Sequence, residues 1–335
     1  MQPPEDRKSF QPRDDAQSSI ASVDAGAATD FVLVNPAAGG GRAAQILPSL
    51  QRFAQQQTWR VEFCVTASRE ELAAKARRAA NQGYRRLFAL GGDGTFQDLL
   101  NALHDYPNVV LGMLPAGGGN DLAAALGLPA DPLRAAAQLL AHGEACHMDA
   151  VRVRTCDGRV RLYTGGGGVG IDAEASRYAS GAYRKLPGRW RYLLSALRAL
   201  FGFHSVTATI SIAPGEPPFL NSTALLIAVL NTPSYGAGIY LAPEAKTTDG
   251  VLDLVILEDR SLFKALRLLP SLWSKGRLNT DQVLRFQVTG ARIETAMPCY
   301  FHGDGEIFGT TPVEISVIPQ AFCVLRAMET TRSNR

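Results

Sequence analysis

The fold of this chain is set by the stretch Leu87-Phe88-Ala89-Leu90-Gly91-Gly92-Asp93-Gly94-Thr95-Phe96-Gln97-Asp98. Its apolar beginning is typical of a buried parallel strand, and its glycines let the backbone turn tightly and approach a ligand closely. A helix is expected to follow to Leu103, so backbone N–H groups and a helix N-terminus point at one spot that suits phosphate. The Asp93 carboxylate would repel phosphate unless a divalent cation lay between them. The stretch alone therefore indicates a nucleotide with Mg2+ or, more simply, a tight strand-to-helix turn without a ligand.

The composition is that of a globular protein with a substantial core and enough length for two domains, since 46% of the 335 residues are hydrophobic and 19% are charged. A formal net charge of +3 is too small to indicate a nucleic-acid partner. The five cysteines contain no CxxC pair, which is typical of buried thiols in a reducing compartment and not of a disulfide framework or zinc site. No apolar run reaches the roughly 18–20 residues of a membrane span. Residues 1–29 lack the apolar segment of a signal peptide and are expected to form a disordered tail of a cytoplasmic protein.

Two further glycine-rich loops follow predicted strands. The strand Phe31–Val34 runs into Asn35-Pro36-Ala37-Ala38-Gly39-Gly40-Gly41, and the strand Val109–Leu114 runs into Pro115-Ala116-Gly117-Gly118-Gly119-Asn120-Asp121. Strands and helices alternate along this half of the chain, which predicts a doubly wound parallel α/β domain. Ligands of such sheets bind beyond the carboxyl ends of the strands, so we expect the three loops to converge on one ligand. The other predicted elements here are a helix over 43–56, a strand over 59–65, a helix over 70–81 and a helix over 132–142.

The pattern changes near residue 145, where we place a boundary between a domain over 30–145 and a β-rich domain over 146–327, with a short tail over 328–335. Alternating hydrophobicity there predicts antiparallel strands, the first two joined by a hairpin turn at Cys156-Asp157-Gly158-Arg159. The sequence does not decide whether the last strands pair with the first domain or close the second. The predicted strands cover 147–154, 159–164, 206–212, 224–230, 252–257, 283–288, 291–295, 313–318 and 323–327, and the predicted helices cover about 173–201 and 262–274.

The chain resembles the diacylglycerol kinase catalytic-domain superfamily of lipid kinases, which is related to sphingosine and ceramide kinases. The resemblance rests on four motifs in order: Asn35-Pro36-x-x-Gly39-Gly40, Gly91-Gly92-Asp93-Gly94-Thr95, Pro115-x-Gly117-x-x-Asn120-Asp121 and Asp304-Gly305-Glu306. It spans about residue 30 to 327. It implies an ATP-binding α/β domain, a β-sandwich-like lipid domain and an active site in the cleft between them.

The resemblance also implies which residues contact ATP. The first loop and the strand end at Thr66 would contact the nucleotide, the opening loop would wrap the phosphates, and the third loop would contribute through its backbone. Gly118 stands where the family usually has Thr, while Gln97 and Asp98 stand where Asn and Glu are common. The implied nucleotide contacts are Asn35, Pro36, Ala37, Ala38, Gly39, Thr66, Gly91, Gly92, Asp93, Gly94, Thr95, Phe96, Gln97, Asp98, Gly118 and Asn120.

Two sets of metal contacts are implied in the same way. Asp93, Asp121 and Asp149 match acidic positions of a metal–water network around the phosphates, although helix capping explains Asp121 and a solvated strand edge explains Asp149 equally simply. The segment 246–251 resembles a structural Mg2+ loop of bacterial members, in which an Asp side chain and two backbone carbonyls hold the ion. Its ligands would be Asp249 through its carboxylate and Lys246 and Val251 through their carbonyls, and a plain Asp-Gly turn is the alternative.

The late segment Phe301-His302-Gly303-Asp304-Gly305-Glu306 offers groups that could deprotonate an alcohol, as phosphorylation of a hydroxyl requires. The resemblance assigns the base to its Asp-Gly-Glu. Alternate residues of an extended segment face the same side, so both carboxylates can reach the cleft. Either Glu306 or Asp304 is therefore the expected proton acceptor. His302 lies outside the motif, and a solvated hairpin explains it equally well.

Two segments, 177–203 and 260–277, suit an anionic membrane surface because they interleave basic residues with aromatic and leucine residues. An amphipathic helix packed on the β-domain explains each of them as well. Together with the lipid substrate, they predict peripheral membrane association. Oligomeric state is open, a homodimer included. The alternatives to an ATP-dependent lipid kinase are an NAD kinase, which shares the Gly-Gly-Asp-Gly motif, and a non-catalytic lipid- or nucleotide-binding regulator on the same fold.

Overall fold

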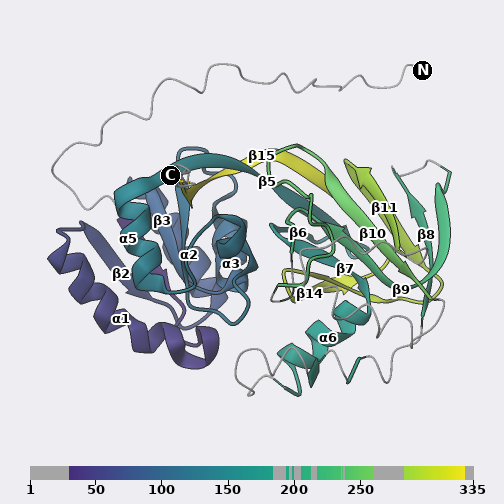
Figure 1. Ribbon diagram of the computed structural model, residues 1–335, viewed down its shortest axis with the longest axis horizontal. Coiled ribbons are helices and arrows are strands. Elements are labelled where there is room, and N and C mark those ends of the chain that lie inside the picture. Colours follow the sequence, from purple (N-terminus) through teal and green to yellow (C-terminus); the bar gives the residue numbers. More distant parts are fainter. Residues whose placement is uncertain are drawn as a thin grey trace, which may run out of the picture.

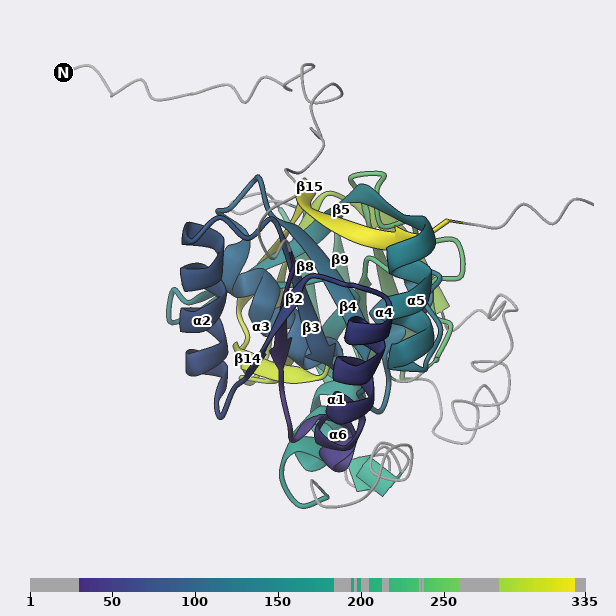
Figure 2. The same cartoon turned by 90° about the vertical axis from the view of Figure 1, so that its left-hand side faces the viewer.

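A parallel sheet forms the first part of the computed structural model, which describes residues 30–183, 194–195, 198–199, 205–212, 217–234, 236, 238–259 and 283–328. Four strands pair in the spatial order β4-β3-β1-β2, all parallel. The apolar runs of β1 and β3 are buried because helices cover both faces of the sheet, α2 and α3 on one face and α1, α4 and α5 on the other (Figure 2). The elements are β1 (Asp30–Val34), α1 (Ala38–Gln56), β2 (Val61–Val65), α2 (Arg69–Asn81), β3 (Arg86–Gly91), α3 (Asp93–Leu103), β4 (Val110–Pro115), α4 (Asp121–Ala125) and α5 (Pro132–His142).

The doubly wound α/β arrangement predicted for this part of the chain is confirmed. Its core joins the strands to the buried faces of the helices, with Val32, Leu50 and Leu99 all fully buried. The start of α1 differs from a regular helix, because Gly39, Gly40 and Gly41 have φ of 61°, 70° and 96°. These left-handed conformations make the first turn a glycine loop, and the regular helix follows it, close to the start expected at residue 43.

An antiparallel β region makes up the rest of the described chain, and it packs around a second core that includes Tyr163, Ile227 and Phe301. Its strands alternate between buried and exposed positions, as in β8, because one face of each lies on this core. The β-sandwich-like second domain is thereby confirmed. Its elements are β5 (Gly143–Thr155), β6 (Val160–Tyr163), β7 (Gly166–Gly170), α6 (Ile171–Ser180), β8 (Val206–Ser211), β9 (Leu220–Leu230), β10 (Leu252–Glu258), β11 (Val283–Val288), β12 (Gly290–Thr295), β13 (Tyr300–Gly303), β14 (Glu306–Thr310) and β15 (Val313–Ala327).

Two long strands, β5 and β15, run along both parts of the molecule and join them (Figure 1). β15 pairs antiparallel with β12 in the second part and, further along, parallel with β4 through Cys323 and Val324. The separate strands predicted over 313–318 and 323–327 are therefore one strand. Its register against β5 shifts between Ile318 and Phe322. The question that the sequence left open is answered by this strand, which both closes the second part and extends the first sheet.

The glycine-rich run after Thr164 forms a strand that the sequence analysis did not predict. β7 (Gly166–Gly170) is fully buried between β9 and β13. Its glycines permit close backbone packing, because a Cβ on Gly167 would lie 2.4 Å from the His302 carbonyl oxygen and one on Gly168 would lie 2.3 Å from that of Ile227. β13 and β14, which form the hairpin around the Asp-Gly-Glu motif, are also strands that the sequence did not predict. The helix predicted over 262–274 and the first 29 residues lie outside the described residues.

Candidate active site

Three glycine-rich loops lie together at the carboxyl ends of β1, β3 and β4, as the parallel order of these strands requires. The first and third loops touch, since a Cβ on Gly39 would lie 2.1 Å from the carbonyl oxygen of Ala116. The second and third loops touch as well, since a Cβ on Gly117 would lie 2.4 Å from the Cα of Gly92. Glycine is thus needed at these positions for loop-to-loop contact. A Cβ added to Gly40 would meet no atom within 4 Å, so the first loop borders open space there.

Side-chain hydrogen bonds tie these loops into one surface. The Asn35 amide donates to the Thr95 hydroxyl at 3.0 Å, which links the first loop to the second. Thr66, at the end of β2, donates to the carbonyl of Val34 at 3.0 Å and lies beside the first loop. Asn120, with φ of 60°, accepts the Gly117 N–H and donates to the Gly117 carbonyl, which orders the third loop. Pro36, Ala37 and Gly118 lie in the same loops, while Ala38 begins α1 and Gly91 ends β3 next to them.

Asp93 holds the third loop against the second. Its carboxylate accepts the backbone N–H groups of Asn120, Asp121 and Leu122 at 2.8, 3.3 and 3.1 Å, at the beginning of α4. Burial raises the pKa of Asp93, and these backbone hydrogen bonds offset part of that rise. The carboxylate is therefore part of the architecture that positions the loops.

Phe96 and Gln97, which follow Thr95, contact other parts of the molecule. Phe96 is fully buried and packs against Phe322 in the core. The buried Gln97 amide donates to the carbonyl of Gly303 at 3.0 Å, so it contacts the second part of the molecule. Asn101, one turn further along α3, both donates to and accepts from the backbone of Leu162. One face of α3 thus fixes the position of the Asp304–Glu306 hairpin relative to the loops.

Asp304 is held by four donors from the start of the β7 segment. Its Oδ2 accepts from the N–H of Thr164 at 2.9 Å and from its hydroxyl at 3.2 Å, and its Oδ1 accepts the N–H groups of Gly165 and Gly166 at 2.9 and 3.1 Å. Burial raises the pKa of Asp304 to about 6, helped by the charge of Asp93 and opposed by the hydrogen bonds from Thr164 and Gly165. A Cβ at Gly165 would lie 2.9 Å from Asp304 Oδ1, so this position leaves room for the Asp304 carboxylate.

Glu306 lies against the first turn of α3 and between two arginines. A Cβ on Gly94 would lie 3.1 Å from Glu306 Oε1. This oxygen bonds Nη2 of Arg69 at 2.5 Å, and Oε2 bonds Nη2 of Arg161 at 3.2 Å. Asp98 lies within 3.7 Å of Arg69 and 3.8 Å of Arg161. Burial, followed by the charge of Glu306, raises the pKa of Asp98 to about 6, while both arginines act in the opposite direction.

Arg69 and Arg161 were not singled out by the sequence analysis. Arg69 begins α2 three positions after Thr66, and Arg161 occupies an ordinary alternating position of β6. Both residues look like solvated surface charges in the sequence. Only the folded chain brings them to Glu306.

The other carboxylates expected to bind metal each accept hydrogen bonds from backbone N–H groups, and their partners differ. Asp121 accepts the N–H of Gly238 at 2.9 Å. Asp149 is fully buried and accepts the N–H groups of Gly250 and Gln320 at 2.7 and 2.8 Å. Asp249 is exposed and accepts the N–H of Val251 at 3.2 Å, which leaves most of its lone pairs for another partner. Across the part of the chain that the structure describes, no three His, Cys, Asp or Glu side chains are grouped to hold a metal.

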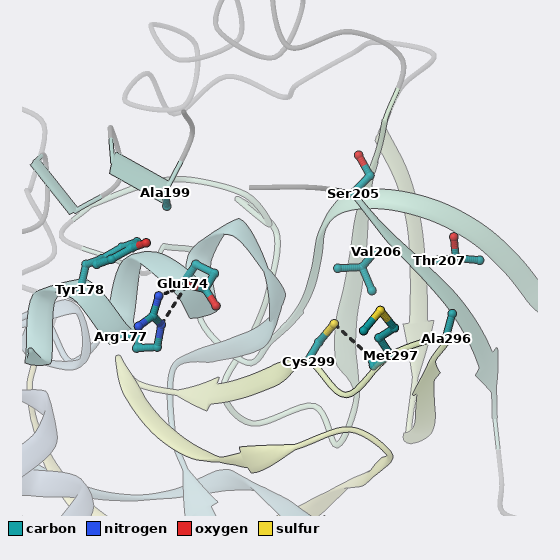
Figure 3. Close-up of a pocket in the computed structure, with 10 residues that line it drawn as sticks. All are labelled: Glu174, Arg177, Tyr178, Ala199, Ser205, Val206, Thr207, Ala296, Met297 and Cys299. Atoms are coloured by element: carbon teal, nitrogen blue, oxygen red, sulfur yellow. Dashed lines mark hydrogen bonds and ion pairs between the residues drawn. The ribbon is translucent and has the colours of Figure 1, made fainter. Parts of the chain in front are cut away.

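A hollow of about 560 Å3 lies in the β-rich part, beside α6 (Figure 3). Its apolar lining includes Val206, Met297 and Cys299, and Arg177 and Glu174 pair with each other at one side. β13 begins next to Cys299 and leads directly to Asp304 at its other end. The hollow and the Asp304–Glu306 hairpin are therefore connected by one short strand.

No described helix is both long and apolar enough to cross a membrane. Most of the segment over 184–203 and all of 260–277 lie outside the described residues, so the predicted membrane contacts stay predictions.

Both parts of the chain match known protein families. Residues 30–153 match the diacylglycerol kinase catalytic domain, and residues 167–326 match the YegS C-terminal NAD kinase beta sandwich-like domain. A diacylglycerol kinase of Mycobacterium tuberculosis is 27% identical over 294 residues, which cover 88% of this chain and 94% of that protein. A probable lipid kinase YegS-like of Cronobacter sakazakii is 29% identical over 242 residues, 71% of this chain and 77% of that protein. The crystal structure of a putative diacylglycerol kinase from Bacillus anthracis shares the fold, with a TM-score of 0.72, 20% identity and coverage of 89% and 97% of the two chains.

Proposed function

Because this chain belongs to the diacylglycerol kinase catalytic-domain superfamily and is a kinase of the lipid kinase type, we propose that it transfers the γ-phosphoryl group of ATP to the hydroxyl of diacylglycerol or a related lipid alcohol. One observation carries the proposal. The Asp304–Glu306 hairpin of the second domain is bonded through Gln97 and Arg69 to the helices that begin beside the glycine loops, and we take this junction of the two domains as the proposed active-site cleft. A nucleotide held by the loops and a lipid hydroxyl held at the hairpin would therefore face each other.

The glycine loops suit the triphosphate of a nucleotide. Their backbones approach each other closely, and α3 presents the N-terminus of a helix of 11 residues beside them. Unbonded N–H groups at such an N-terminus favour an anion, and the open space over Gly40 leaves room for one. Asn35, Thr66, Thr95 and the loop backbones would hold ATP, while Asp93 and Asn120 keep the loops in place.

Mg2+ would neutralise the charge that develops on the phosphoryl oxygens when it is bound with the nucleotide. The exposed Asp249 carboxylate, with one backbone N–H bonded to it, has the oxygen chemistry of a Mg2+ ligand. Together with the carbonyls of Lys246 and Val251 it would hold a structural ion. Asp149 ties this loop to β15 through Gly250 and Gln320, so an ion there would act on the joint between the domains.

Glu306 is better placed than Asp304 to accept the proton of the lipid hydroxyl. A carboxylate has about four lone-pair positions. Asp304 uses four of them for Thr164, Gly165 and Gly166, whereas the contacts of Glu306 to Arg69 and Arg161 use two. Glu306 also lies at the first turn of α3, next to the loop proposed to hold the phosphates. Asp304 would then organise the hairpin from which Glu306 extends.

The hollow beside α6 supports a lipid acceptor. Its volume of about 560 Å3 lies within the size range of small-molecule sites, and its apolar lining suits an alkyl chain. β13 separates the hollow from the hairpin, and it spans only the residues Tyr300–Gly303. Because extended backbone rises about 3.3 Å per residue, a long alkyl chain in the hollow could reach the hairpin. The basic and aromatic residues over 177–203 would bring this face to an anionic bilayer. Equal sedimentation with neutral and anionic vesicles, unaffected by neutralising Arg184, Lys185 and Arg189, would contradict that membrane contact.

A radiolabelled-ATP assay tests the function. Mixed micelles would offer diacylglycerol, monoacylglycerol, ceramide and sphingosine, with NAD in a separate reaction. We expect label in a lipid, and Glu306→Gln should lower kcat by about 100-fold or more, as removal of a general base does. Asp304→Asn should also lose activity, but with greater loss of stability, because it replaces an acceptor of four hydrogen bonds.

Other outcomes of this assay point to the alternatives. Label in NAD alone would identify an NAD kinase. Binding of ATP without transfer to any acceptor would favour a non-catalytic regulator.

A further inference from the structure

Four charged side chains from four different elements meet at the cleft. Arg69 comes from the start of α2, Asp98 from α3, Arg161 from β6 and Glu306 from the start of β14. Glu306 bonds one arginine through each of its two carboxylate oxygens, at 2.5 and 3.2 Å. Asp98 lies at 3.7 and 3.8 Å from the same arginines, so each guanidinium is shared by two carboxylates.

The two arginines differ in how they are held. Arg161 belongs to the same domain as Glu306 and lies over the ring of Phe308 at 4.6 Å, with a further contact of 3.5 Å to Gln97. Arg69 belongs to the nucleotide-binding domain, and its side chain is 48% exposed. Arg161 therefore anchors one carboxylate oxygen from within the domain, and Arg69 reaches the other oxygen from across the cleft.

The direction of Glu306 matters because of what lies beside it. The carboxylate lies beside Gly94, because a Cβ on Gly94 would lie 3.1 Å from Glu306 Oε1, and Gly94 is in the first turn of α3 and within the loop proposed to hold the phosphates. A proton acceptor must be within hydrogen-bond reach of the attacking hydroxyl, so a small rotation of this side chain would remove it from use. A guanidinium bonded to each oxygen restricts such rotation, because turning the carboxylate away would break at least one of these two charge-assisted hydrogen bonds.

We propose that Arg69 and Arg161 are positioning residues that hold the Glu306 carboxylate at the first turn of α3, with Arg69 completing the arrangement only when the two domains meet. This inference rests on the proposed function for its catalytic consequence. Its structural part, that Arg69 orders the hairpin over 303–307, stands independently.

An ordinary surface salt bridge is the competing explanation, and it makes a different prediction. Partly exposed ion pairs contribute little to stability, so removing one should change neither the stability nor the turnover appreciably. Arg326 offers a matched control, because its side chain is 49% exposed and pairs with the carboxylate of Glu144. It lies on β15, outside the cleft.

The experiment compares Arg69→Gln, Arg69→Lys, Arg161→Gln and Arg326→Gln in the full-length protein. Lipid kinase assays give kcat and both KM values, and hydrogen–deuterium exchange measures the peptide over 303–307. We expect Arg69→Gln to lower kcat by about tenfold or more with the KM for ATP within about twofold, and to speed exchange of that peptide. Arg69→Lys should recover part of kcat, since it keeps the charge and loses the fork. Arg326→Gln should match the wild type in each measurement.

Two results would overturn the inference. One is unchanged exchange of the 303–307 peptide in both Arg69→Gln and Arg161→Gln. The other is a raised KM for ATP with unchanged kcat, which would assign Arg69 to nucleotide binding. If the wild type phosphorylates no lipid, the proposed function fails by itself, and the exchange measurement still decides whether Arg69 positions Glu306.

Discussion

The replacement Asp149→Asn tests how the two domains are joined. Asp149 is fully buried at the point where β15 shifts its register against β5, and its two oxygens accept the N–H groups of Gly250 and Gln320 at 2.7 and 2.8 Å. An asparagine has the same shape but offers one oxygen and one NH2 group. One backbone N–H would keep an acceptor, now neutral, and the other would face a donor.

The expected cost follows from these contacts. A buried N–H without an acceptor costs about 1–3 kcal/mol, and exchanging a charged for a neutral acceptor costs about 1 kcal/mol more. We therefore expect Asp149→Asn to lower the free energy of unfolding by about 2–4 kcal/mol. Asp157→Asn is the control, since Asp157 also accepts hydrogen bonds but is 45% exposed, and it should destabilise the protein clearly less than Asp149→Asn does.

Urea unfolding with equal m-values measures this difference, and amide exchange at Gly250 and Gln320 locates it. A destabilisation by Asp149→Asn no larger than that of Asp157→Asn would refute the reasoning. So would unchanged exchange at both amides. Asp149 would then have to be assigned to the metal–water network that the family resemblance implies.

Three other predictions concern the cleft and the hollow. The pKa of Asp98 is raised to about 6, above its unfolded value, so the native state binds more protons between about pH 4 and 6 and its stability falls as the pH rises through that window. Asp98→Asn should remove about 1–3 kcal/mol of this fall, as measured by urea unfolding at pH 4 and pH 6. An equal change of stability with pH in the variant and the wild type would contradict this prediction. Gly117→Ala places a Cβ 2.4 Å from the Cα of Gly92 and should raise the KM for ATP about tenfold or more by separating the loops. Unchanged kinetics would show that ATP binding does not require contact between these loops. Ala296→Trp fills the hollow from an exposed position. It should raise the KM for long-chain diacylglycerol about tenfold and leave the KM for dihexanoylglycerol unchanged. An equal effect on both KM values would exclude the hollow as an alkyl-chain site.

Much of the fold was predictable because its signals are local. Apolar runs ending in glycine clusters predicted strands β1, β3 and β4 and the loops after them, and strand–helix alternation predicted the parallel sheet. β7, β13 and β14 were not predictable in this way. β7 contains four glycines in five residues, and its conformation is imposed by close packing against the backbones of its two neighbouring strands.

The sequence likewise predicted some features of the site and not others. The loop glycines were predicted from the strand-to-helix pattern, and the family resemblance then identified Asp304 and Glu306 as members of the same site. Their individual tasks depend on neighbours far along the chain. Phe96 packs in the core, Gln97 reaches Gly303, and Asp304 has its lone pairs filled by the segment over 164–166.

The sequence by itself determined that this protein has an α/β domain carrying three glycine loops and a β-rich domain carrying an Asp-Gly-Glu motif. Residue type and spacing suffice for that, because glycine conformations and strand periodicity act within a few residues. Only the tertiary structure decided that β15 joins both domains and that Arg69 meets Glu306. Those two residues are 237 positions apart, and no local preference of the chain encodes a contact over that separation.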